Sequence, residues 1–253
     1  MTAVLTKTMV PLAKMFFYEE NEFYVMQLDT VADIGKYSLH YEFRGSLTRD
    51  LRGLYLSSYQ TPENETRYLA TTQFEPTDAR KAFPCFDEPR FKATFSIKLI
   101  HDPAYIALSN MPVIGTEITT TGLQITHFEK TVSMTTYLVA VIVCDFTHIS
   151  GNSSGGQVRV FARKDEIDKT EYALGAALKI LTYFEEYFAI KYPLPKLDLI
   201  AIPDFSSGAM ENWGLISFRE ARLLYGTDTS SSLDVQNVCR VIAHEIAHMA
   251  MVW

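Results

Sequence analysis

The stretch Val241-Ile-Ala-His-Glu-Ile-Ala-His248 lies near the end of the 253-residue chain. Apolar residues around it recur at the spacing of one helix face: Val235, Val238, Cys239, Ile242, Ile246 and Met249. On such a helix His244 and His248 project from the same side, one turn apart. This spacing lets both imidazoles bind one Zn²⁺, and Glu245 is placed to accept a proton from a metal-activated water. The alternative is a helix whose surface contains these residues by chance.

The same helix is expected to begin after Ser231, because Ser231 and Asp234 have the spacing of a capping box, and to run to Trp253. A catalytic zinc site uses three protein ligands and one open position. The five residues after His248 include no His, Cys, Asp or Glu, and no upstream residue stands out as a third ligand. We therefore expect an incomplete zinc site with weak activity at best, and an apolar helix face that lacks packing partners.

A second motif, Gly208-Ala-Met-Glu-Asn-Trp-Gly214, lies upstream. Its small residues allow the backbone to approach an extended peptide and to pair with it as an added strand. Glu211, at the end of such a groove, is suited to bind a positively charged α-amine. The alternative is a Gly-rich loop between two strands with no role in binding.

A third segment, residues 72–89, is rich in carboxylates and prolines and contains Gln73 and Glu75. The same composition is typical of a rigid loop held by salt bridges. Spacing alone therefore does not assign this segment to a site.

Residues 22 to about 160 have the pattern of β-structure. The run Tyr137–Val143 is continuously apolar and predicts a strand buried on both faces, and Gly151-Asn152 is typical of a turn. Two sets of alternating apolar residues predict half-buried strands: Tyr24, Met26 and Leu28, and Phe95, Ile97 and Leu99.

The pattern changes at a Gly/Ser-rich stretch, residues 152–156, which predicts a boundary between domains 1–155 and 156–253. A strand at Val158–Ala162 follows. An apolar face then indicates a helix from Ala173 to Phe188, ending before Pro193, and a short apolar strand follows at Leu197–Ile202.

The composition is that of a soluble globular protein, with 47% hydrophobic residues and a net charge of −7. No basic patch indicates a nucleic-acid partner. The chain has three cysteines, which are few and cannot all pair, so no disulfide framework is expected. Lysines interrupt residues 1–17, so no signal peptide is expected, and no apolar run is long enough to span a membrane. Asn64 and Asn152 begin sequons that suit glycan acceptors in a secreted protein.

Together these motifs resemble the aminopeptidase N family of zinc exopeptidases, and in particular its oxytocinase subgroup. The resemblance runs from about Tyr37 to His248 and includes residues 72–89, 192–205, the Gly-Ala-Met-Glu-Asn box and residues 241–248. It implies an incomplete β-rich N-terminal domain, a β-sandwich or saddle, followed by the start of an α+β, thermolysin-like catalytic domain.

The resemblance also implies roles for the matching residues. His244 and His248 correspond to zinc ligands, Glu245 to the general base, and Glu211 to the carboxylate that holds the substrate's free amine. Gly208 and Ala209 correspond to a strand that pairs with the peptide, and Met210 and Asn212 complete the same box. Gln73 and Glu75 correspond to the first side-chain pocket and help to bind the amine. The implied protein uses one Zn²⁺, acts on peptides with a free N-terminus, forms a homodimer, and resides at the plasma membrane or in the secretory lumen.

The departures from the family pattern leave two interpretations open. After His248 the family continues with Gln-Trp-Phe-Gly-Asn, where this chain reads Met249-Ala-Met-Val-Trp253. The family's third zinc ligand, a Glu, and its oxyanion-stabilising Tyr come later, and its membrane anchor and first strands come earlier. The chain is thus expected to be part of an active aminopeptidase, or a truncated, catalytically silent product that at most binds peptides or partners. Glu211 and Glu75 argue against a thermolysin-like endopeptidase, because an endopeptidase has no α-amine to hold.

Overall fold

The computed structural model describes residues 11–153 and 156–251, and the chain divides into two compact units, Met1–Glu42 and Phe43–Trp253. Three of the sequence predictions fall partly on residues outside the described ranges. These are the end of the last helix at Trp253, the N-terminus without a signal peptide, at residues 1–10, and the domain boundary, at residues 154–155. Among the described residues, no helix is both long enough and apolar enough to cross a membrane.

The first unit is an antiparallel hairpin of β1 (Leu12–Tyr18) and β2 (Phe23–Leu28). The expected strand is confirmed, but its expected half-burial is wrong, because Tyr24 and Leu28 are 55% and 36% exposed. A hairpin of two strands cannot cover its own faces. Alternation here predicts the strand without predicting its burial.

The second unit begins with two antiparallel sheets, in agreement with the β-rich N-terminal half indicated by the sequence. The alternation expected at Phe95, Ile97 and Leu99 is confirmed, since each is partly buried between exposed neighbours, although only Leu99 lies in a strand. The larger sheet has the order β3 (Gly53–Gln60), β4 (Thr66–Gln73), β9 (Val141–Cys144), β6 (Ile106–Ser109), and the smaller has the order β5 (Lys98–His101), β8 (Gln124–Phe128), β7 (Val113–Ile118).

The apolar run Tyr137–Val143 is not the single strand that was expected. Thr136–Leu138 is a 3-10 turn, and β9 begins only at Val141. The reason is Asn110, whose side-chain amide donates to the Leu138 carbonyl at 2.8 Å and whose side-chain oxygen accepts from the Ala140 N–H at 2.9 Å. A buried side chain thus satisfies backbone groups that a strand would pair with its neighbour.

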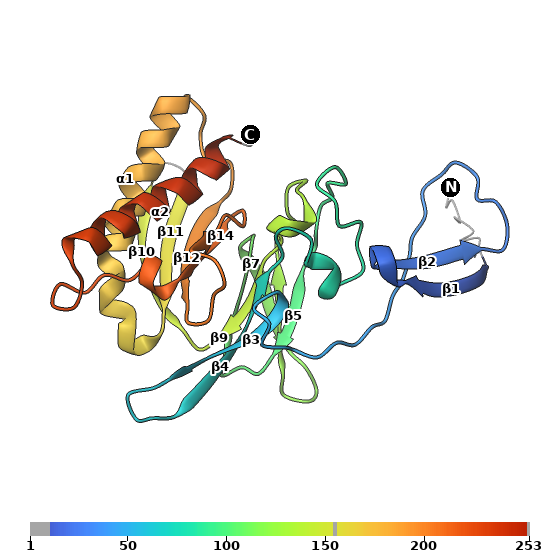
Figure 1. The fold of residues 1–253 in the computed structure, drawn as a ribbon, viewed down its shortest axis with the longest axis horizontal. Helices are drawn as coiled ribbons and strands as arrows, with labels where there is room; N and C mark the ends of the chain where they lie inside the picture. The colour runs from blue at the N-terminus through green and yellow to red at the C-terminus, as the bar shows by residue number, and fades with distance from the viewer. Residues whose placement is uncertain (1–10, 154–155, 252–253) are drawn as a thin grey trace. The chain divides into compact units, whose positions relative to one another are not determined.

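A five-stranded sheet forms the second half of this unit, the part that the sequence resemblance implies to be the start of a catalytic domain. In Figure 1 its helices lie on one side and the two antiparallel sheets on the other. Every residue of β12 is buried, as is typical of a strand covered on both faces. The order is β10 (Thr147–Ser153), β11 (Gly156–Ala162), β12 (Lys196–Ile202), β14 (Leu215–Arg219), β13 (Ala209–Met210), with β11, β12 and β14 parallel.

The turn expected at Gly151-Asn152 is wrong, because both residues lie within β10 and pair with β11. A Cβ on Gly151 would lie 2.8 Å from Leu178 Cδ1, so glycine here allows a helix to approach the strand. The boundary between domains 1–155 and 156–253 stays a prediction, and it falls between these two paired strands.

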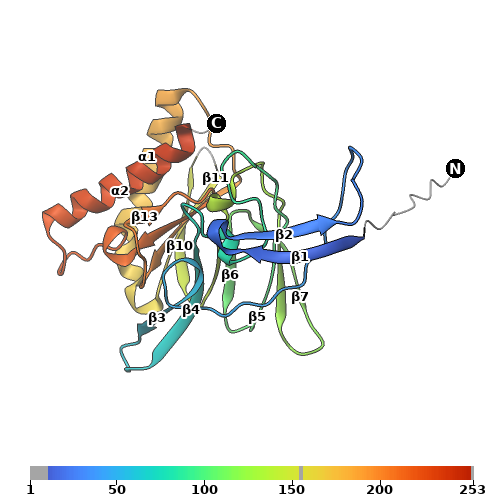
Figure 2. The ribbon, with the colours of Figure 1, turned by 45° about the vertical axis from the view of Figure 1, so that its right-hand side comes forward.

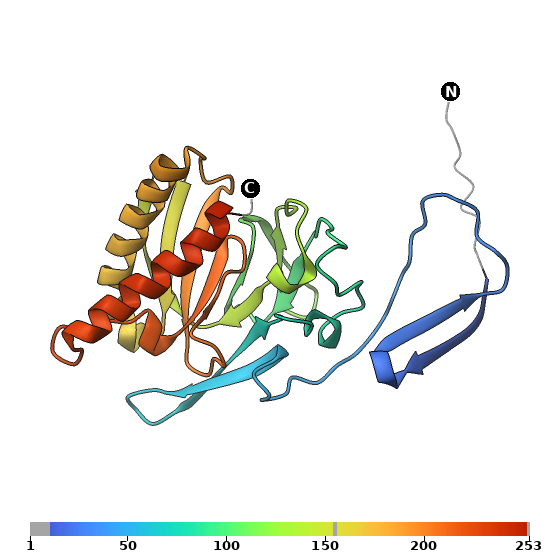
Figure 3. The same ribbon diagram turned by 45° about the horizontal axis from the view of Figure 1, so that its top comes forward.

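Two helices, α1 (Glu171–Phe188) and α2 (Ser232–Met251), pack against one another, α1 over β10 and β11 and α2 beside β13 (Figure 3). The expectation that α2 lacks packing partners is wrong, because Val238, Ile242, Ile246 and Met249 are at most 1% exposed. The apolar face expected for α1 is also only partly correct. Tyr187 is 69% exposed, whereas Glu185 is buried in line with Ala173, Ala177 and Leu181.

A buried cluster of charges joins the β-rich half to the five-stranded sheet. The Lys196 ammonium, 4% exposed, donates to the Ser109 carbonyl at 2.7 Å and the Gly214 carbonyl at 2.6 Å, and lies 2.6 Å from Asp198 Oδ2. Arg159 makes a bidentate pair with the same carboxylate, both distances being 2.7 Å. Burial lowers the pKa of Lys196, and the charge of Asp198 opposes that shift.

Gly214 brings the two halves into backbone contact beside this cluster. Its φ is +79°, and a Cβ at this position would lie 2.2 Å from the Asn110 carbonyl oxygen. The Asn110 amide also donates to the Trp213 carbonyl at 2.9 Å. No residue with a side chain fits here, because both the backbone angle and the contact exclude one.

We predict that Asp198→Leu lowers the free energy of unfolding by about 3–5 kcal/mol, because it leaves the buried Lys196 ammonium without its counter-charge. Urea unfolding of the chain measures this change. The control is Arg67→Met, whose ion pair with Glu65 is 49% and 62% exposed and is worth about 0–1 kcal/mol. Equal losses in the two variants would contradict the prediction, and adding Lys196→Met to Asp198→Leu should recover part of the loss.

Candidate metal and amine site

The start of α2 sets the direction in which its polar side chains project. The capping box expected there is confirmed: the Ser231 N–H donates to Asp234 Oδ2 at 2.8 Å, and the Asp234 N–H donates to Ser231 Oγ at 3.3 Å. These bonds satisfy donors that a helix start would otherwise leave unpaired.

His244 and His248 lie one turn apart on α2, with their Nε2 atoms 3.1 Å apart. Two imidazole nitrogens bound to one tetrahedral Zn²⁺ at about 2.0–2.1 Å are roughly 3.3 Å apart. The observed separation therefore fits two ligands of one ion.

Glu245 follows His244 on α2, and its side chain is 5% exposed. Its Oε2 atom is buried without a hydrogen-bond partner among the described residues. Burial raises the pKa of Glu245 to about 8, and the negative charges of Glu211 and Glu75 add to the shift. A carboxyl group with a pKa near neutral pH is suited to accept and return a proton.

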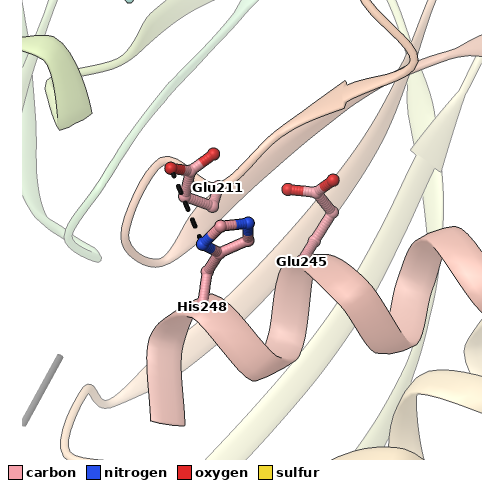
Figure 4. Close-up of side chains that lie close together, drawn as sticks. All are labelled: Glu211, Glu245 and His248. Carbon is pink, nitrogen blue, oxygen red and sulfur yellow. Dashed lines mark ion pairs between the residues drawn. The ribbon is translucent and has the colours of Figure 1, made fainter. Parts of the chain in front are cut away.

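Glu211 follows β13 and faces α2 from the opposite side of the site. Its Oε1 lies 4.0 Å from His248 Nδ1, an ion-pair distance longer than a hydrogen bond. Figure 4 shows the Glu211 carboxylate next to the His248 ring, with Glu245 projecting from the same side of α2. Glu211, Glu245 and His248 each offer one ligand atom within 4.8 Å of the others.

Glu75 and Gln73 approach the site from the end of β4. Burial raises the pKa of Glu75, the charge of Glu211 raises it further, and His248 opposes the shift. The Gln73 amide lies 3.6 Å from Met210 Sδ, and its Oε1 is buried without a partner among the described residues. Side chains from the β-rich half thus lie close to Glu211 and Met210 of the half that contains the five-stranded sheet.

The Gly208–Asn212 motif forms the outer edge of the five-stranded sheet. Ala209 and Met210 form β13, which pairs with β14 and has no second neighbour among the described strands. This edge of the sheet lies beside α2 (Figure 2). The Gly208 carbonyl accepts from the Arg219 N–H at 3.0 Å, and a Cβ on Gly208 would meet no atom nearer than 4.0 Å. Asn212 is buried, with its amide 3.4 Å from Ser217 Oγ. The packing of the described chain therefore does not require glycine at position 208.

Tyr137 belongs to this cluster and was missed in the sequence, where it was assigned to a strand. Burial raises the pKa of its phenol, and the negative charges of Glu211 and Glu75 raise it further, while the neighbouring Thr135 hydroxyl opposes the shift. The 3-10 turn fixed by Asn110 is what brings Tyr137 to these carboxylates. No spacing in the sequence indicates that turn.

The residues gathered here fit a zinc ion. Two imidazoles at a chelating distance and carboxylates beside them are the donors that Zn²⁺ uses in proteins. The buried, unpartnered Glu245 Oε2 also indicates a place for a cation or a proton.

We predict that the metal-free chain loses stability as the pH rises from about 4.5 to about 8, the ordinary and folded-state pKa values of Glu245. The unfolded chain ionises this carboxyl freely, whereas the folded chain must hold a buried carboxylate, so the folded state binds more protons in this range. Glu245→Gln should make this dependence shallower, while the part that comes from Glu75, whose pKa is also raised, should remain. Urea unfolding with a chelator present measures it, and parallel pH profiles for the two proteins would contradict the prediction.

Comparison with known proteins identifies the family. The Peptidase M1 N-terminal domain model matches residues 2–138, and the Peptidase family M1 domain model matches residues 172–251. The chain is 56% identical over 214 residues to endoplasmic reticulum aminopeptidase 2 of Bos taurus, which covers 84% of this chain and 22% of that protein. It is 50% identical over 213 residues to endoplasmic reticulum aminopeptidase 1 of Homo sapiens, covering 84% and 23%.

Glutamyl aminopeptidase of Rattus norvegicus is 46% identical over 244 residues, which cover 94% of this chain and 26% of that protein. The chain thus spans about a quarter of the length of the curated relatives it matches. With an M1 N-terminal domain match over more than half of its residues and an M1 catalytic match after it, the chain belongs to peptidase family M1.

Proposed function

We propose that this chain carries the metal-binding and amine-binding part of a zinc-dependent aminopeptidase, which removes N-terminal residues from peptides. The observation that supports this most strongly is the meeting of an imidazole pair, a buried carboxyl and a carboxylate from a separate strand, at His244, His248, Glu245 and Glu211. The relatives reported above are all aminopeptidases, which points the same way.

His244 and His248 hold the zinc ion in this proposal. When bound, zinc polarises the scissile carbonyl and makes water a better nucleophile at neutral pH. Glu245 takes the proton from the attacking water and delivers it to the leaving amine. Its raised pKa suits both transfers, because the group must gain and lose a proton in each turnover.

Glu211 and Glu75 hold the substrate's α-ammonium group. Their mutual repulsion, which contributes to the raised pKa of Glu75, is relieved when a cation lies between them. The free edge of β13 at Ala209 is suited to pair with an extended peptide backbone. Gln73 and Met210, in contact with one another, border the space for the first side chain.

The proposed cellular location is the secretory lumen or the plasma membrane. It rests on the names of the two endoplasmic reticulum relatives. The exposed hairpin turn at Asn64, part of a sequon, suits a glycan in that compartment.

We predict that the chain binds one zinc ion, and that His244→Ala or His248→Ala weakens this binding strongly, because each removes a ligand. Glu245→Gln should keep the zinc ion. Titration with a chromophoric chelator measures the affinity. Zinc binding that is unaffected by both His substitutions would contradict the assignment.

In turnover of an aminoacyl anilide, Glu245→Gln should lower kcat by about 10²–10⁴-fold, because the proton acceptor is lost while the metal stays. Bound zinc with no measurable turnover in the unsubstituted chain would favour the catalytically silent, peptide-binding alternative.

We also predict that a fluorescent peptide with a free N-terminus binds more tightly than its N-acetylated form. Glu211→Ala should abolish this preference, because the ammonium group loses its carboxylate. Fluorescence anisotropy measures binding without requiring catalysis. The control is Glu63→Ala, a carboxylate exposed at the turn between β3 and β4, and equal affinity for the two peptides in the unsubstituted chain would rule out amine recognition.

A further inference from the structure

We infer that Glu211 is a positioning residue for the metal as well as the partner of the amine: its carboxylate orients the His248 ring. This inference rests on the proposed role of His248 as a zinc ligand. It assigns Glu211 two functions that meet in one side chain.

The two nitrogens of His248 face different partners. Nε2 lies 3.1 Å from His244 Nε2, on the side where the imidazole pair meets. Nδ1 lies 4.0 Å from Glu211 Oε1, on the opposite side of the ring (Figure 4). The described residues offer no other partner to Nδ1 within hydrogen-bond distance. The ring therefore lies between its helix neighbour and the carboxylate, which is near enough to act on Nδ1 through its charge.

This arrangement selects one form of the neutral ring. A neutral imidazole carries its proton on one nitrogen and presents a lone pair on the other. A carboxylate beside Nδ1 stabilises the proton there, which leaves the Nε2 lone pair directed toward His244 and the metal. Metal-binding histidines in proteins commonly have a carboxylate next to the second nitrogen, which fixes the ring orientation and strengthens the ligand.

The carboxylate can act in this way because its backbone is fixed. Met210, on one side, pairs with Ser217 in β14, and Asn212, on the other, contacts the same Ser217 through its side chain. The Glu211 side chain is only 16% exposed, whereas His248 is 41% exposed. The more buried, better anchored group thus sets the orientation of the more exposed one.

A direct consequence is that amine binding and metal binding are coupled. An ammonium group held by Glu211 neutralises the charge that acts on His248. A bound amine should therefore weaken zinc binding, and by linkage bound zinc should weaken binding of the amine by the same factor.

The test measures zinc affinity of the 253-residue chain by competition with a chelator, for the unsubstituted chain, Glu211→Ala, Glu211→Gln and Glu75→Gln. We expect both Glu211 substitutions to weaken zinc binding by about 10–100-fold, the usual cost of losing a carboxylate behind a ligating histidine. Glu75→Gln removes the same charge from the same pocket but not the group that lies 4.0 Å from Nδ1, so it should weaken zinc binding less than either Glu211 substitution. An equal loss in Glu75→Gln would show that the effect comes from the net charge of the pocket and not from the position of Glu211, and it would overturn the inference.

A second measurement does not require metal. Nitrogen NMR of histidine-labelled, metal-free chain reports which ring nitrogen of His248 carries the proton. We expect Nδ1 in the unsubstituted chain and a shift toward Nε2 in Glu211→Ala, a change that a general loss of packing would not produce. Protonation at Nε2 in the unsubstituted chain would overturn the inference.

The outcomes separate this inference from the proposed function. If Glu211→Ala loses the preference for a free amine but keeps unsubstituted zinc affinity and the same His248 proton position, the proposed function stands and the positioning role is overturned. If the unsubstituted chain does not bind zinc, both are overturned.

Discussion

The two halves of the second unit are held in register by one buried positive charge. The Lys196 ammonium contacts the carbonyl that ends β6, the carbonyl that precedes β14 and the Asp198 carboxylate of its own strand. None of these partners can move away without leaving a charge unpaired in the protein interior, where an unpaired charge lowers the stability of the fold. Glu75 follows β4 in one half and Glu211 precedes β14 in the other, so this junction determines how far apart the two carboxylates lie.

The candidate site is a place where like charges have been brought together. Glu245 and Glu75 both have raised pKa values, and in each case burial comes first and the charge of Glu211 second. Such a cluster is unfavourable when empty and becomes favourable when cations enter it. A metal ion at the imidazoles and an ammonium group at the strand edge would each relieve part of the repulsion. The same electrostatic arrangement would therefore suit both of the proposed ligands.

Local patterns in the sequence predict the elements whose structure is set by residues within the element itself. The final helix, its capping box and the position of His244 and His248 follow from periodicity and spacing, and so does the buried strand β12. Features set by distant partners could not be predicted this way. Asn110 turns the run at residues 137–140 away from a strand, Glu185 takes a core position that suits an apolar residue, and the contact of Glu211 with His248 joins two segments whose separation in the chain carries no signal. Motif resemblance indicated that both residues belong to one site, but not that they touch.

Gly214 limits how a site on this fold can change during evolution. At this point the backbones of the two halves are in direct contact, and the Asn110 carbonyl occupies the space that any side chain would need. The sheets cannot slide past one another there, and the segment from Glu211 to Gly214 cannot be lengthened or tilted without breaking that contact. Change in proteins built on this junction is thus confined to exchanging side chains around a fixed backbone, such as those at Gln73 and Met210. Changes in the length or backbone path of the segment from Glu211 to Gly214 would break the contact with Asn110.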